Sequence, residues 1–159
     1  MKITILPNSE GHPYFAFDFV KSQLHLRWLT KDEKNKLDPH SRDAFFDLST
    51  NNCIIRTEKR KKNVFSPRFP FGFDRWRLLL TILFAAGEFI YLPSENHVYA
   101  AFARIHKVFG KQRRKKSDYW FIVDRNPSYR VRLNPSRSYL IITNSKFDGL
   151  PLDLLSIQK

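Results

Sequence analysis

Two candidate helices separated by a short apolar run constrain this chain more than any other stretch. Residues 73–87 read FDRWRLLLTILFAAG and residues 94–110 read SENHVYAAFARIHKVFG, and each segment contains apolar residues at helical spacing and ends on glycine. The first segment is nearly all apolar after Arg77, so we expect a buried scaffold helix. The second is amphipathic, with Arg104 and Lys107 outside its apolar stripe. The stripe consists of Val98, Phe102, Ile105 and Phe109.

The segment before these helices predicts short strands with one or two short helices. Residues 14–20 and 24–29 are rich in aromatic and aliphatic side chains and fit the two strands of a hairpin. The same residues also fit one amphipathic helix, because Phe17, Val20, Leu24 and Trp28 lie at helical spacing. Periodicity leaves both open, and we favour the strands. Further strands are predicted over residues 2–6 and 53–57, and short helices over residues 30–37 and 40–50, the first with a Thr30–Glu33 capping box.

Three strands are predicted after the second helix, over residues 118–124, 129–133 and 138–143. The connections between them are short and contain Asn–Pro pairs, which favours an antiparallel meander. Strand alternation places Arg130 and Arg132 on one face of the middle strand. The predicted fold class is therefore α+β, with the two helices packed on antiparallel strands.

The predicted organisation is one compact domain made of four consecutive parts. Residues 1–62 form a neutral α+β part, and residues 63–72 form an ordered connection rich in proline and phenylalanine. Residues 73–146 form the basic helix–helix–meander part, and residues 147–159 a tail.

The helix–helix–strand order of residues 73–143 resembles the winged-helix domains. The resemblance is one of topology and covers about half of the chain, and winged-helix domains have three helices where two are predicted here. It implies that the second helix enters the major groove of DNA while a β-hairpin contacts the flanking backbone. In that arrangement Arg130 and Arg132 would be the phosphate contacts of the hairpin.

The net charge of +13 is concentrated in the part of the chain around the two helices. Residues 1–55 carry seven basic and seven acidic side chains, whereas residues 56–146 carry twenty and six. Such a surface attracts phosphate backbones. We therefore expect a non-enzymatic nucleic-acid-binding protein, and the helix and hairpin order favours duplex DNA, with RNA close behind.

Two dense basic runs and several lone cations are the predicted phosphate contacts. These residues are Lys59, Arg60, Lys61, Lys62, Arg104, Lys107, Lys111, Arg113, Arg114, Lys115, Lys116, Arg130 and Arg132. Phe69 and Phe71, beside prolines in the connecting segment, are the predicted rings for stacking on unpaired bases.

Two other interpretations stay open. The first is a nuclease that holds Mg²⁺ or Mn²⁺ through carboxylates before the basic part, with Asp38, Asp47 and Glu58 as the candidates. The second is a basic subunit of a ribonucleoprotein or other nucleic-acid assembly, whose neutral N-terminal part binds a protein partner. The binding-protein interpretation itself requires no cofactor or metal.

Cys53 is the sole cysteine, which excludes a disulfide within the chain and a cluster of thiolates around zinc. We expect a buried, inert thiol. The longest apolar stretch is too short to span a bilayer, and the N-terminus lacks the features of a secretory signal. The sequence therefore predicts no membrane partner and an intracellular location, in the cytoplasm or, in a eukaryote, the nucleus.

Overall fold

The computed structural model describes residues 2–57, 60–65, 72–109, 119–126 and 128–158, with residues 57, 60–65 and 73 described by their backbone alone. The helices are α1 (Lys31–Asn35), α2 (Phe73–Phe84) and α3 (Asn96–Val108), with a 3₁₀ turn, η3 (Leu152–Leu154). The strands are β1 (Ile3–Ile5), β2 (Tyr14–Val20), β3 (Gln23–Leu29), β4 (Ala44–Asp47), β5 (Asn52–Thr57), β6 (Arg60–Phe65), β7 (Ile90–Tyr91), β8 (Phe121–Asp124), β9 (Arg130–Leu133), β10 (Tyr139–Asn144) and β11 (Leu155–Ile157). The α+β class is confirmed.

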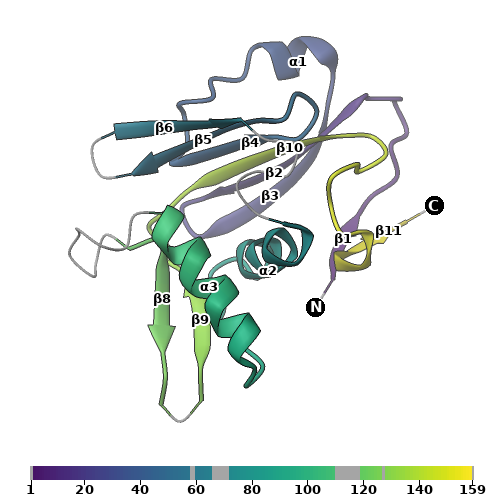
Figure 1. The fold of residues 1–159 in the computed structure, drawn as a ribbon. Coiled ribbons are helices and arrows are strands. Elements are labelled where there is room, and N and C mark those ends of the chain that lie inside the picture. The colour runs from purple at the N-terminus through teal and green to yellow at the C-terminus, as the bar shows by residue number, and fades with distance from the viewer. Residues whose placement is uncertain (1, 58–59, 66–71, 110–118, 127, 159) are drawn as a thin grey trace.

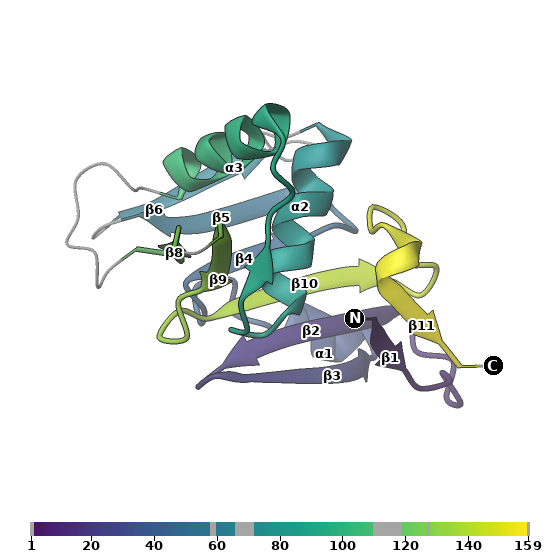
Figure 2. The same ribbon diagram turned by 90° about the horizontal axis from the view of Figure 1, so that it is seen from below.

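The strands form three sheets (Figures 1 and 2). A six-stranded sheet has the order β3-β2-β10-β4-β5-β6, and a three-stranded sheet has the order β7-β9-β8. In the third sheet, β1 and β11 pair in parallel. The predicted helices α2 and α3 are both present, and α2 packs against the large sheet and contacts α3 and β9.

The hydrophobic core occupies both faces of the large sheet because its central strands are apolar on both sides. On one face, Phe15, Phe17 and Phe19 of β2 pack with α2, and the rings of Phe17 and Phe84 stack 4.8 Å apart. On the other face, Ala16 packs in a smaller cluster with residues of β4, β5 and β10. The scaffold role predicted for the first helix is confirmed, since four of its apolar side chains have no exposed surface. They are Leu79, Leu80, Ile82 and Leu83.

Residues 14–29 form a β-hairpin, which resolves the choice between strands and helix. The register pairs Val20 with Gln23, and Lys21 and Ser22 both have positive φ, 51° and 63°. Two residues of positive φ give the turn whose twist matches a two-residue hairpin. The capping box before α1 is also confirmed, because Thr30 Oγ1 accepts from the Glu33 amide and Glu33 accepts from the Thr30 amide.

The short helix predicted over residues 40–50 is wrong, because residues 44–47 form strand β4. All four of its residues are buried, and β4 lies between β10 and β5 in the large sheet. Sheet pairing on both sides satisfies the backbone of this segment, and that tertiary gain outweighs the local helical preference.

The predicted three-stranded meander is also wrong, although all three strands exist. β8 and β9 pair antiparallel, but β10 leaves them and pairs with β2 on one side and β4 on the other. The third place beside β9 is taken by β7, from the short run between the helices. The physical reason lies in Leu140, Ile141 and Ile142, which are buried on both faces of the strand and so need a sheet covered on both sides.

Cys53 is buried in β5 with 5% of its surface exposed, as expected, and burial raises the pKa of its thiol. A high pKa leaves little thiolate at neutral pH, and the thiolate is the reactive form. We predict that a thiol-reactive chromophore labels the native protein more than about a hundredfold more slowly than the denatured chain, since reaction then requires local opening. Absorbance stopped-flow measures both rates, and rapid stoichiometric labelling of the native protein would contradict the prediction.

Candidate nucleic-acid interface

Helix α3 buries its apolar stripe and presents cations on its outer side, as the sequence predicts. Phe102, Ile105 and Phe109 are each 1% exposed or less. Arg104 and Lys107 are exposed, and so are the two small residues Ala100 and Ala103 on the same side of the helix. The outer side of α3 is therefore a basic surface on which small side chains lie between the charged ones.

A groove with a volume of about 290 Å³ runs between α3 and β8. Its walls come from one side of α3, from β8 and the residues on either side of it, and from the residue before β9. The lining residues are Phe102, Ala103, His106, Tyr119, Phe121, Ile122, Val123, Arg125 and Tyr129. Figure 1 shows α3 lying against the β8–β9 hairpin. The groove is thus mainly aromatic, with one arginine at its β8 side.

The aromatic rings of the groove support one another in fixed edge-to-face and stacked contacts. His106 is 3% exposed, and its ring lies edge-on to Tyr119 at 5.4 Å and to Phe121 at 5.7 Å between centroids. Tyr129 stacks on Tyr99 of α3 at 4.7 Å. Edge-to-face and offset stacked rings are the favoured aromatic geometries, so the wall of the groove is well ordered before any ligand arrives.

Arg125 completes the groove on the side of the β8–β9 turn. Its side chain is exposed, and its guanidinium carbon lies 5.1 Å from the centroid of the Tyr129 ring. This cation–π contact holds the charge beside the groove. Neither Arg125 nor His106 was among the site residues predicted from the sequence. The sequence feature that could have indicated the groove is that aromatic residues flank the basic run 111–116 on both sides.

Arg130 and Arg132 lie on the opposite face of the small sheet from α3. Val131, between them, is fully buried toward the helices, whereas both guanidinium groups lie over the ring of Phe89, at 4.2 and 5.3 Å from its centroid. Arg130 also donates to Asp124 at 2.6 and 3.0 Å. The structure therefore does not bring these arginines together with Arg104 and Lys107 on one surface.

Arg130 and Asp124 form an ion pair within the β8–β9 hairpin, and this pairing shifts the pKa values of both groups. The Asn126 amide and the Arg130 guanidinium donate to Asp124 and lower the pKa of its carboxyl group. The same pairing raises the pKa of Arg130. The charge of Arg130 is thus partly neutralised before any partner approaches.

Most of the two dense basic runs lies outside the described residues. Lys59, Phe69, Phe71 and residues 111–116 belong to that part, and Arg60, Lys61 and Lys62 are described only as the backbone of the edge strand β6. The described residues nearest to the run 111–116 in the sequence are Phe109 and Tyr119. Phe109 packs on Phe121 at 5.3 Å, and Tyr119 lines the groove.

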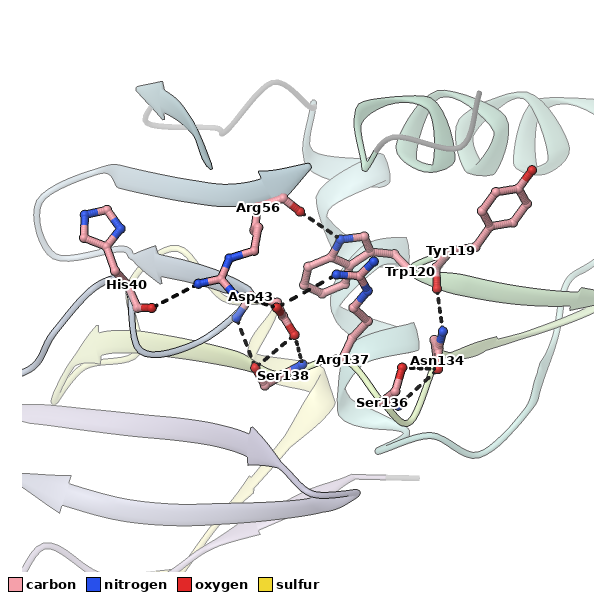
Figure 3. Close-up of polar contacts among 9 residues, drawn as sticks. All are labelled: His40, Asp43, Arg56, Tyr119, Trp120, Asn134, Ser136, Arg137 and Ser138. Carbon is pink, nitrogen blue, oxygen red and sulfur yellow. Dashed lines mark hydrogen bonds and ion pairs between the residues drawn. The ribbon is translucent and has the colours of Figure 1, made fainter. Parts of the chain in front are cut away.

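Trp120 fixes the start of β8 to the large sheet (Figure 3). Its side chain is 1% exposed, and its indole N–H donates to the Arg56 carbonyl of β5 at 3.4 Å. The guanidinium of Arg137 lies 5.4 Å from its ring, and Phe109 contacts it edge-on at 5.0 Å. The neighbouring Tyr119 carbonyl accepts from the Asn134 side chain at 2.8 Å. These contacts hold Tyr119 in position at the groove.

Asp43 connects the same junction to β10 (Figure 3). Its amide donates to Ser138 Oγ at 3.0 Å, and the Ser138 amide donates back to Asp43 Oδ2 at 3.0 Å. Its other carboxylate oxygen lies 3.5 Å from Arg56 and 3.9 Å from Arg137. One carboxylate therefore balances two arginines where the two sheets meet.

The carboxylates predicted for a nuclease make structural contacts where they are described. Asp47 is 6% exposed, pairs with Lys34 at 3.0 Å and accepts from Ser49. Asp38 accepts from the His40 amide at 2.8 Å in its own loop, and Glu58 lies outside the described residues. Among the residues placed by the structure, no three His, Cys, Asp or Glu side chains are grouped as metal ligands would be.

Comparison with protein-family models, with curated proteins and with solved structures finds no match to this chain. Within the described ranges, no helix combines the length and the apolar character needed to cross a membrane. What the groove and the basic surface of α3 can do is therefore inferred from their geometry and chemistry.

Proposed function

We propose that this protein binds nucleic acid through the outer side of α3 and the adjoining α3–β8 groove. The observation that carries the proposal is the presence of exposed cations on α3 next to an aromatic groove that itself contains an arginine. Arg104 and Lys107 are exposed on the helix, and Arg125 lines the groove beside β8. Cations next to aromatic rings are the combination that proteins use to hold a phosphate backbone and its bases.

The contrast with several paired arginines supports this role. Arg42 is paired with Asp18, Arg56 with Asp43 and Arg130 with Asp124. Arg104 and Lys107 have no carboxylate within ion-pair distance in the part of the chain that the structure describes. Their charges are therefore available to phosphates, and the run 111–116, which follows the same helix in the sequence, carries further positive charge.

Binding should depend steeply on salt, because each neutralised phosphate releases condensed counterions. The measurement is fluorescence anisotropy with labelled single-stranded DNA, duplex DNA and RNA, titrated from about 50 to 200 mM salt. We expect the affinity for at least one of the three to fall by about a hundredfold or more across this range. Binding that is insensitive to salt, or absent with all three, would contradict the proposal.

The same samples test the metal-dependent nuclease interpretation. Labelled strands are incubated with the protein, with and without Mg²⁺ or Mn²⁺, and resolved on a denaturing gel. Cleavage that requires the metal and is lost in Asp47→Ala would favour the enzyme over a binding protein. Retention of intact strands under conditions that give full binding would favour the binding protein.

A further inference from the structure

We propose that the α3–β8 groove takes an unpaired nucleobase, so that the preferred partner is single-stranded nucleic acid. This inference rests on the proposed function and gives it a substrate class. It differs from the duplex preference that the predicted helix and hairpin order suggested, because Arg130 and Arg132 lie on the face of the small sheet away from α3.

The size and lining of the groove fit a flat aromatic ligand. Its volume of about 290 Å³ is near the lower end of the range for small-molecule pockets, about 300 Å³. Its walls are mostly rings and aliphatic side chains, with few polar groups. A base inside a duplex is stacked and paired on both sides, so it cannot enter such a groove unless it leaves the helix. An unpaired base has its faces free.

The rings that line the groove offer faces and edges for stacking. Tyr119 is half-buried, so part of its ring is accessible, and the guanidinium of Arg125, held over the Tyr129 ring, offers a second flat surface. Every base has a π-face, so stacking of this kind tolerates any sequence. The groove therefore predicts binding with little base preference.

Cations in and near the groove fit a nucleic-acid strand. Arg125 lines the groove beside β8, whereas Arg104 and Lys107 are exposed on α3 outside its lining. A strand with one base in the groove would meet Arg125 there and the α3 cations where it continues across the helix. This distribution of charge favours a nucleic-acid strand over an apolar or neutral peptide added to the edge of β8.

Two alanines on α3 provide a matched pair of variants. Ala103 lines the groove, whereas Ala100, one turn earlier on the same side of the helix, does not. Both are exposed, so a tryptophan at either position changes neither charge nor core packing. Ala103→Trp would fill the groove, and Ala100→Trp would add the same side chain outside it.

The probes are a fluorescein-labelled oligothymidylate of about 12 nucleotides and an abasic strand of the same length and charge. We expect the unmodified protein to bind the thymidylate at least about tenfold more tightly than the abasic strand, in line with the stacking of one base or more. Ala103→Trp should lose most of this preference and keep its affinity for the abasic strand. Ala100→Trp should retain the preference.

The outcomes separate this inference from the proposed function. Equal affinity for thymidylate and abasic strands, or an equal effect of the two tryptophans, would overturn the base-binding groove while leaving polynucleotide binding in place. Absence of binding to any strand would overturn both. Circular dichroism establishes that each variant is folded. Arg125→Ala gives a second test, because removing the cation beside Tyr129 should also weaken binding of the thymidylate.

Discussion

Replacing Arg104 and Lys107 together by glutamate should lower the affinity for a single strand by about a hundredfold near 50 mM salt, on the order of tenfold for each cation reversed. Both side chains are exposed on α3, so the substitutions leave the core untouched. They remove two positive charges from the proposed interface and add two negative ones. The slope of log affinity against log salt should also fall by about two, because fewer counterions are released. Fluorescence anisotropy over a salt series measures both quantities.

The matched control places the same two reversals far from α3. Lys31 and Lys36 are exposed at the two ends of α1, which lies on the other side of the molecule from α3 in Figure 1. Lys31→Glu with Lys36→Glu gives the same net charge as the α3 variant. We expect it to lose only a few-fold in affinity, through the weaker overall field. Equal losses in the two double variants would show that net charge, and not the α3 surface, determines binding.

Trp120→Ala should lower the free energy of unfolding by about 3–5 kcal/mol, as large buried aromatic residues do when truncated. The indole is 1% exposed and joins Phe109, Arg137 and the Arg56 carbonyl at the junction of the two sheets. Its loss leaves a cavity where β8 meets the large sheet. Urea unfolding followed by far-ultraviolet circular dichroism measures the change, which spans a large part of the stability of an ordinary domain.

A conservative variant separates packing from hydrogen bonding at this site. Trp120→Phe keeps an aromatic ring but removes the N–H that donates to Arg56, so its cost should be clearly smaller, about 1–2 kcal/mol. A loss below about 1 kcal/mol in Trp120→Ala would contradict a close-packed junction. Tyr119 lines the groove and precedes Trp120, so Trp120→Ala should also weaken single-strand binding at temperatures where the protein remains folded.

The local features of the fold could be predicted from the residues because their causes are local. The Thr30–Glu33 capping box, the hairpin over residues 14–29 and the apolar stripe of α3 each depend on side chains a few positions apart. The buried character of α2 followed from its leucine and isoleucine residues, which only Thr81 interrupts between positions 78 and 83. Each of these elements was identified, with ends displaced by a few residues.

The pairing of strands that are distant in the sequence could not be predicted, because short connections favour pairing between strands that follow one another in the chain. β9 and β10 are separated by only a few residues, yet they belong to different sheets. The two-sided burial of Leu140, Ile141 and Ile142 distinguishes β10 from β9, whose residues alternate between buried and half-buried. Segment 44–47 was missed for the same reason, since its strand character depends on β10 beside it.

The candidate site was likewise predicted only in part. The basic surface of α3 was predicted from helical spacing, but the groove was not, because its walls combine α3 with residues beyond the run 111–116. His106 and Arg125 acquire their places only when α3 and β8 lie side by side. Arg130 and Arg132 were correctly predicted to share one face of their strand. Alternation along a strand does not predict which face points toward α3, so their separation from the α3 cations was not foreseen.

The central position of β10 has a consequence for the order in which the protein folds during synthesis. The large sheet is joined across its middle by β10, which pairs with β2 from residues 14–20 and with β4 from residues 44–47. On the ribosome, the N-terminal strands emerge about 100 residues before the strand that unites them, and translation at about 5–20 residues per second makes that interval several seconds long. Until then β2 and β4 each have an unpaired edge, which is a site for association with other chains. Nascent chains that stall before residue 139 should therefore depend on chaperones to stay monomeric.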